Sequence, residues 1–112
     1  MDNLLVSGCN GFIGSHLVKS LSTEYGVIGI SNHMDKSLGI KMIEKNICKT
    51  TNKDISENIF CIIHLAAITD IQYCQKNPTE CFEVNAMGTQ KMLEIARKKD
   101  SKFIYVSTSH VY

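Results

Sequence analysis

The stretch "VSGCNGFIGSHL", residues 6–17, places Gly8, Gly11 and Gly14 at a constant spacing of three. An apolar run at 3–7 precedes these glycines and predicts a strand, and the segment after them has the apolar spacing of a helix. Glycines at such a turn let the backbone adopt positive φ, approach a ligand closely and pack a helix against a strand. The stretch therefore predicts a phosphate-binding turn. A glycine-rich turn that only joins two elements is the alternative.

The rest of the sequence alternates between strand-like and helix-like segments. Strands are predicted at 26–31, 41–47, 58–65 and 102–107, and helices at 12–21 and 79–99. We expect the second helix to bury Phe82, Ala86, Leu93 and Ala96, and to begin after Asn77 and Pro78. Alternating strands and helices predict an α/β fold, a Rossmann-like doubly wound parallel sheet of about five strands. In such a sheet ligands lie beyond the carboxyl ends of the strands.

Composition limits the kinds of partner. Twelve Lys and Arg against eleven Asp and Glu leave a net charge of +1, which argues against nucleic-acid and membrane surfaces and favours a small ligand. The five cysteines are odd in number and show no C-x-x-C spacing, so we expect no disulfide framework. The start of the chain, MDNLLVSG, does not resemble a signal peptide. These features favour a reducing cytoplasm. A length of 112 residues predicts one domain, 1–112.

Four ordered motifs carry a resemblance to a known family. They are "SGCNGFIGSHLVKSL" at 7–21, "IIHLAAITDIQYCQKNP" at 62–78, "FEVNAMGTQKMLEIARK" at 82–98 and "FIYVSTSHVY" at 103–112. Together they resemble the extended short-chain dehydrogenases/reductases, the NAD-dependent epimerase/dehydratase group that acts on nucleotide sugars. The resemblance covers essentially the whole chain and is weaker between 32 and 58.

The resemblance implies roles for particular residues. Those implied to hold the cofactor pyrophosphate are Gly8, Gly11, Phe12, Ile13 and Gly14, with the backbone N–H groups of Phe12 and Ile13 as donors. Leu65, Ala66 and Ala67 match the family's wall beside the adenosine and the nicotinamide ribose, and Thr69 would follow them near the nicotinamide side. Asn85 would position the site, and Thr108 would be the catalytic hydroxyl that bonds the reacting substrate oxygen. Read without the motifs, Asn85 is an ordinary helix amide and Thr108 an ordinary strand-end hydroxyl.

Departures from the family pattern leave some choices open. Ser31, followed by Asn32, stands where the family often has the Asp that bonds the adenosine ribose, so the cofactor is NAD or NADP, with NAD favoured. Asn46, followed by Ile47, takes the place of the Asp that meets the adenine. The two acidic residues that follow the catalytic hydroxyl in dehydratases are absent after Thr108, which favours epimerase-like or reductase-like chemistry.

The catalytic Tyr-x-x-x-Lys pair of the family occurs nowhere in the 112 residues. The chain is therefore expected to be a truncated, cofactor-binding N-terminal segment that is inactive alone, with nucleotide-sugar substrates only in a longer form. A non-catalytic nucleotide-binding or protein-interaction module is the alternative. The strand that begins at Lys102 would leave an apolar edge, so we expect self-association there. No metal site is predicted, and His64 is expected to be a core histidine. Cys9 in the glycine turn is assigned no role.

Overall fold

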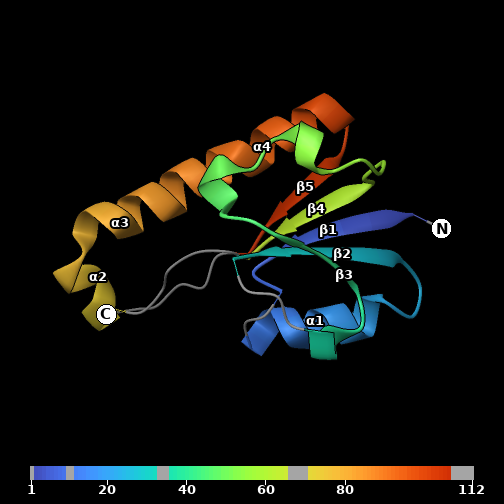
Figure 1. The fold of residues 1–112 in the computed structure, drawn as a ribbon, viewed down its shortest axis with the longest axis horizontal. Coiled ribbons are helices and arrows are strands. Elements are labelled where there is room, and N and C mark those ends of the chain that lie inside the picture. The colour runs from blue at the N-terminus through green and yellow to red at the C-terminus, as the bar shows by residue number, and fades with distance from the viewer. Residues whose placement is uncertain (1, 10–11, 33–35, 66–70, 107–112) are drawn as a thin grey trace.

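A parallel sheet forms the centre of the molecule (Figure 1). The computed structural model describes residues 2–9, 12–32, 36–65 and 71–106. The strands are β1 (Asn3–Ser7), β2 (Gly26–Ser31), β3 (Lys41–Glu44), β4 (Cys61–His64) and β5 (Lys102–Tyr105). They pair in parallel in the order β3-β2-β1-β4-β5. This arrangement confirms the predicted α/β, Rossmann-like sheet.

The central strand β1 is where the direction of the crossovers reverses. The chain leaves β1 for β2 on one side, and later returns to place β4 on the other side. In the register, Leu5 lies opposite both Ile28 and Ile62, and all three side chains are buried. In a doubly wound sheet a ligand crevice opens at this reversal, beyond the carboxyl end of β1.

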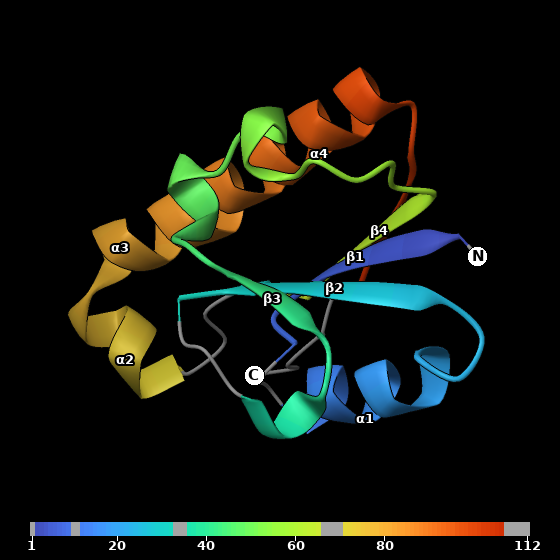
Figure 2. The ribbon, with the colours of Figure 1, turned by 45° about the vertical axis from the view of Figure 1, so that its right-hand side comes forward.

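Helices cover both faces of the sheet (Figures 1 and 2). One face packs against α1 (Phe12–Leu21) and the short 3-10 turn η1 (Lys36–Leu38), and the other packs against α4 (Gly88–Lys99), η2 (Ile47–Lys49) and η3 (Asn52–Asp54). Each face has its own buried cluster. Val6 and Val18 belong to the cluster on the α1 side, whereas Leu5, Met92 and Ile95 belong to the cluster on the α4 side. β1 is therefore buried on both faces, as a near-continuous apolar strand predicts.

The helical region predicted at 79–99 is present but interrupted. It consists of α3 (Pro78–Phe82), the π-helical turn η4 (Glu83–Met87) and α4. Pro78 occupies the first turn after the cap Asn77, which confirms the predicted start signal.

The face predicted for this helical region is wrong. Phe82 is 71% exposed and Leu93 is 48% exposed, and Ala86 is exposed as well, whereas Ala96 is buried as predicted. The helix buries Met92 and Ile95 in their place. A π turn contains extra residues, so it shifts the apolar stripe between α3 and α4. Apolar residues such as Met92 and Leu93 are adjacent in the sequence, so periodicity did not determine which of them is buried.

Three predicted strands are longer than the observed ones. The strand predicted at 41–47 ends at Glu44, because Asn46 caps η2 by accepting the backbone N–H of Cys48 at 2.9 Å. The strand predicted at 58–65 is observed as β4, over Cys61–His64. The strand predicted at 102–107 is β5 over 102–105, and its last predicted residue lies outside the described residues.

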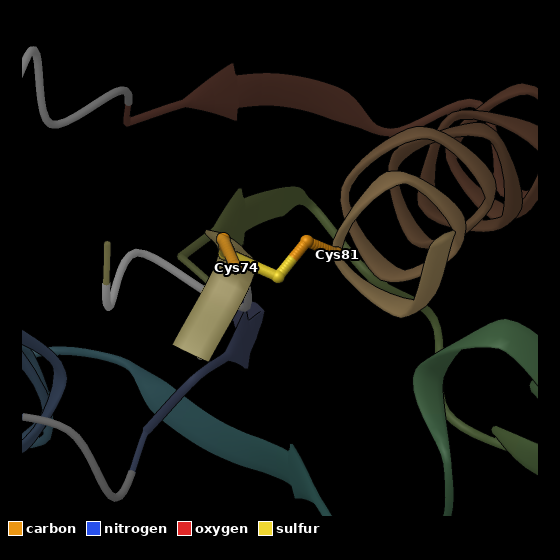
Figure 3. The surroundings of a disulfide bond; sticks show 2 residues. All are labelled: Cys74 and Cys81. Atoms are coloured by element: carbon orange, nitrogen blue, oxygen red, sulfur yellow. A yellow bond between two sulfur atoms is a disulfide. The ribbon is translucent and has the colours of Figure 1, made fainter. Parts of the chain in front are cut away.

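A disulfide joins Cys74 of α2 (Ile71–Lys76) to Cys81 of α3, with 5.6 Å between their Cα atoms (Figure 3). The cysteine spacing led us to expect no disulfide framework, and it did not predict this single pair. The corner at Asn77 and Pro78 folds two short helices toward each other, and no C-x-x-C spacing signals such a corner. α2 itself was not predicted. The described cysteines outside this disulfide are Cys9 and Cys61, which are buried, and Cys48, which is half-buried.

Candidate functional site

The turn between β1 and α1 brings two glycine backbones into contact. Gly8 follows β1 directly and has φ of +71°, a conformation that glycine adopts without a steric cost. A Cβ on Gly14 would lie 2.9 Å from the carbonyl carbon of Gly8 and closer still to its oxygen. Only a glycine at this position of α1 lets the helix lie directly against the turn. Two of the three structural reasons given for the glycines are therefore present in the geometry.

The amino end of α1 lies at this turn. Phe12 begins the helix, so the N–H groups of its first turn have no partner within the helix. These groups and the helix dipole favour an anion at this end. Gly11 lies outside the described residues, and for Phe12 and Ile13 only the backbone is described. The glycine turn thus lies at the amino end of a ten-residue helix, a position that favours an anionic group such as a diphosphate.

Cys9 of the glycine turn points into the protein. It is fully buried in the cluster on the α1 side. A Cβ on Gly29 in β2 would lie 2.6 Å from Cys9 Sγ, so Gly29 provides the space for this side chain. Sequence analysis did not single out Gly29, although a glycine inside a buried strand signals a close approach. Cys9 is a packing residue that anchors the turn on β2.

The carboxyl ends of β1 and β4 are joined by side-chain hydrogen bonds. Ser7 Oγ lies 2.7 Å from His64 Nδ1 and also accepts the backbone N–H of Leu65 at 2.9 Å. His64 Nε2 lies 3.0 Å from Thr89 Oγ1, which donates to the carbonyl oxygen of Asn85 at 2.6 Å. These contacts connect both strands to the π turn and to α4. They confirm His64 as a core histidine with hydrogen-bond partners.

Burial determines the charge of His64. Its side chain is 1% exposed, and desolvation lowers the pKa of its imidazole below the ordinary value. The rings of Phe103 and Tyr105 from β5 lie beside it, with centroids 6.1 and 5.6 Å away. The imidazole is therefore neutral at pH 7, with one nitrogen as donor and the other as acceptor. Sequence analysis did not identify Ser7 and Thr89, which are 57 and 25 positions from His64.

Residues predicted to meet the adenosine half lie after β2 and β3. Ser31 ends β2 and is half-buried, and the next residue, Asn32, is exposed. Asn46 is exposed, and its backbone oxygen accepts the hydroxyl of Thr50 at 2.9 Å. Ile47 is half-buried against α4, where a Cβ on Gly88 would lie 3.0 Å from its Cγ2 atom. Since parallel strands end at one edge of a sheet, these residues share an edge with Gly8.

Residues predicted to meet the nicotinamide half are only partly described. Leu65 follows β4 and packs, half-buried, against the cluster on the α1 side. Asn85 is half-buried in the π turn η4, and π turns often occur at functional sites. Those outside the described residues are Ala66, Ala67, Thr69 and the catalytic candidate Thr108. Hydrogen bonds through His64 thus connect Ser7, which precedes the glycine turn, and the end of β4 with η4.

Comparison with known sequences identifies relatives over nearly the whole chain. Residues 4–112 match the NAD dependent epimerase/dehydratase family. An uncharacterised protein of Methanocaldococcus jannaschii is 35% identical over 98% of this chain and 40% of its own length. The dTDP-D-glucose 4,6-dehydratase of Dictyostelium discoideum is 33% identical over 100% of this chain and 30% of its own length. The chain thus spans well under half the length of these relatives.

Solved structures share the fold. A UDP-glucose 4-epimerase of Thermotoga maritima superposes with a TM-score of 0.86 and 30% identity, over 95% of this chain and 38% of the epimerase. A UDP-glucuronic acid 4-epimerase of Bacillus cereus, solved with UDP-glucuronic acid and NAD, gives a TM-score of 0.85 and 32% identity over 98% of this chain and 41% of the epimerase. Within the described part of this chain, no helix has the length and apolar character needed to cross a membrane. The family match, the sheet order and the glycine turn agree, and the chain belongs to the NAD dependent epimerase/dehydratase family.

Proposed function

We propose that this chain is the NAD(P)-binding part of a nucleotide-sugar epimerase-like or reductase-like protein, and that residues 1–112 form one dinucleotide-binding domain. The carrying observation is the packing of Gly14 against Gly8, which has positive φ, at the carboxyl end of the central strand. A diphosphate there meets bare backbone and the amino end of α1. The NAD named with the Bacillus cereus epimerase supports the same class of ligand.

The proposal assigns the two halves of the dinucleotide to opposite sides of β1. Ser31 and Asn32 would meet the adenosine ribose, and Asn46 and Ile47 the adenine, because they follow β2 and β3. Leu65 begins the segment that would meet the nicotinamide side, because it follows β4. The reversal of crossovers at β1 places these two groups of residues on its two sides.

Catalysis is proposed only for a longer protein. Thr108 would supply the hydroxyl that bonds the reacting oxygen of a nucleotide sugar, but a base of the Tyr-x-x-x-Lys type is absent from these residues. We therefore propose that the 112-residue chain binds a dinucleotide without turning over a sugar. We propose the cytoplasm as the location of the protein. Thiols are kept reduced there, so dinucleotide binding should be measured both with the Cys74–Cys81 disulfide and with the two cysteines reduced.

Calorimetry with NAD+, NADH, NADP+ and NADPH tests the proposal on the unaltered chain. We expect saturable binding of at least one of them, and no binding at millimolar concentration would contradict the proposal and favour the interaction-module alternative. Ser31→Asp sharpens the test, because a carboxylate at the end of β2 bonds a ribose 2′-hydroxyl and repels a 2′-phosphate. We expect the preference for NAD over NADP to rise about tenfold, a change of about 1.4 kcal/mol. Ser37→Asp, the same substitution in η1, is the control.

We also propose that two copies of the chain associate through β5. β5 is an edge strand, and Ile104 and Tyr105 are each 50% exposed. An exposed apolar edge is a template for strand pairing, and a lysine on the edge blocks it. We expect light scattering to show concentration-dependent dimers that Ile104→Lys abolishes. Leu93→Lys, at a similarly exposed residue of α4, should leave the dimers intact. A monomer at high concentration, or equal effects of both variants, would overturn this assignment.

A further inference from the structure

The hydroxyl proton of Thr89 sets the direction of the hydrogen bonds around His64. A carbonyl oxygen has no proton, so the 2.6 Å contact between Thr89 Oγ1 and the oxygen of Asn85 uses the single hydroxyl proton of Thr89. Thr89 Oγ1 can then only accept from His64, so the proton of the neutral imidazole is on Nε2. Nδ1 is left as an acceptor for the hydroxyl proton of Ser7.

The remaining hydrogen bond, between Leu65 and Ser7, completes the series. Ser7 Oγ accepts the backbone N–H of Leu65, which also donates to the carbonyl oxygen of Ser7 at 3.2 Å, while the Ser7 hydroxyl donates to His64. The direction therefore runs from Leu65 through Ser7 to Nδ1 of His64, and from Nε2 through Thr89 to Asn85. The other tautomer would leave an unprotonated Nε2 facing the Thr89 hydroxyl, whose single proton is donated to the oxygen of Asn85. None of the buried side-chain nitrogen and oxygen atoms in the described part of the chain lacks a partner.

These hydrogen bonds join three segments that the proposed function assigns to the dinucleotide. Ser7 immediately precedes Gly8, Leu65 begins the segment after β4, and Asn85 lies in the π turn η4. Ser7 and His64 are almost completely buried, at 0% and 1% exposure, so water cannot replace the bonds between them. The hydroxyl of Thr89 also holds the carbonyl of Asn85 in a helix whose hydrogen-bond pattern is irregular there.

We propose that His64, in its Nε2–H tautomer, is a positioning residue of the dinucleotide site, because it fixes the glycine turn, the end of β4 and the π turn relative to one another. This inference rests on the proposed function and deepens it. His64 reaches no ligand itself; it acts through Ser7 and Thr89. Loss of these hydrogen bonds should therefore reduce the affinity for the cofactor while the protein stays folded.

The first experiment measures the tautomer in the unaltered chain. Long-range proton–nitrogen NMR correlation separates a protonated ring nitrogen from an unprotonated one. We expect an unprotonated Nδ1 and a protonated Nε2 for His64 at pH 7. A protonated Nδ1, in the neutral ring or in an imidazolium, would overturn the assigned direction and with it the proposal. This measurement does not depend on any variant folding.

The second experiment measures NAD affinity in matched variants. Thr89→Val removes the hydroxyl at nearly constant shape, and Thr89→Ser retains it. Ser101→Ala removes a hydroxyl bond to the carbonyl of Ile59 next to the opposite ends of β4 and β5, so it is the control. We expect Thr89→Val to weaken binding about five- to tenfold, and Thr89→Ser and Ser101→Ala to bind within about twofold of the unaltered chain. Chemical denaturation should show that Thr89→Val and Ser101→Ala are both folded under the conditions of the binding measurement.

The outcomes separate this inference from the proposed function. If the unaltered chain fails to bind any of the four dinucleotides, both are overturned. If the unaltered chain binds and Thr89→Val binds equally well, only the positioning role of His64 is overturned. If Thr89→Ser binds as weakly as Thr89→Val, the Thr89 hydroxyl does not support binding, and the proposed series of hydrogen bonds is wrong.

Discussion

The two ends of the sheet are built differently. At the carboxyl ends, buried side chains bond one another through His64, and the backbone of Gly8 and Gly14 is left without side chains. At the amino ends, side chains bond backbone carbonyls near the surface: Asn3 Nδ2 donates to the oxygen of Asn58, and Ser101 Oγ to the oxygen of Ile59. A buried network depends on every member, whereas separate surface bonds can be lost one at a time. We therefore expect substitutions at the carboxyl ends of the strands to lower the free energy of unfolding more than substitutions at the amino ends.

The largest effect is expected for Gly14→Ala. The added Cβ would overlap the carbonyl of Gly8, and neither backbone can move without breaking the turn. We expect the free energy of unfolding to fall by at least about 3 kcal/mol, as measured by denaturant titration.

Gly39→Ala, shortly before β3 at the amino end, is the matched substitution. Gly39 has φ of +67°, but nothing lies within 4 Å of a Cβ added there. Only backbone strain is introduced, at a cost of about 1–2 kcal/mol. Equal losses for the two variants would contradict the proposed difference between the ends.

The disulfide between Cys74 and Cys81 should give the next largest effect. Both cysteines belong to helices that lie beyond the carboxyl ends of the strands (Figures 1 and 3). Reduction restores conformational freedom to the unfolded chain, so we expect a loss of about 2–3 kcal/mol in the free energy of unfolding. Denaturant titration with and without a reducing agent measures it. Cys48→Ala should leave the difference unchanged, because Cys48 is free. Alkylation of all five cysteines without reductant would refute the pairing.

The pH dependence of stability should report His64. Burial lowers the pKa of its imidazole, whereas the unfolded chain has an ordinary histidine pKa of about 6.5. As the pH falls from about 6.5 toward the pKa of folded His64, the unfolded chain takes up a proton first, so the free energy of unfolding decreases. Thermal unfolding between pH 7 and pH 5 measures this. His64→Asn should flatten the decrease.

The smallest effect is expected for the ion pair of Glu57 with Lys41 at the start of β3. A hydrogen bond from Lys41 is the main reason that the pKa of Glu57 lies below its ordinary value. Its contribution is therefore present above the ordinary glutamate pKa of about 4.3 and is lost as the pH falls through the folded pKa. Because the Lys41 side chain is 56% exposed, we expect Glu57→Gln to cost less than about 1 kcal/mol. A larger loss at neutral pH would show that the amino end is also sensitive to substitution.

Local patterns predicted much of the fold. The strands at 3–7 and 26–31 and the helix at 12–21 have the predicted bounds, because hydrophobic period and glycine positions act over a few residues. Pro78 marked the start of a helix for the same reason. The expected location of the candidate site, at the carboxyl ends of the parallel strands, followed from the order of elements alone. The roles of the individual site residues stay predictions.

By itself, the sequence determined the alternation of strands and helices and the close approach at Gly14, since both depend on neighbours along the chain. Only the tertiary structure decided that Ser7 meets His64 across 57 positions, because side-chain pairing depends on the register between two strands. It also decided that α4 buries Met92 and exposes Leu93. Both residues are apolar and adjacent, so the packing of the helix on the sheet, and not hydrophobicity, selects the one that is buried.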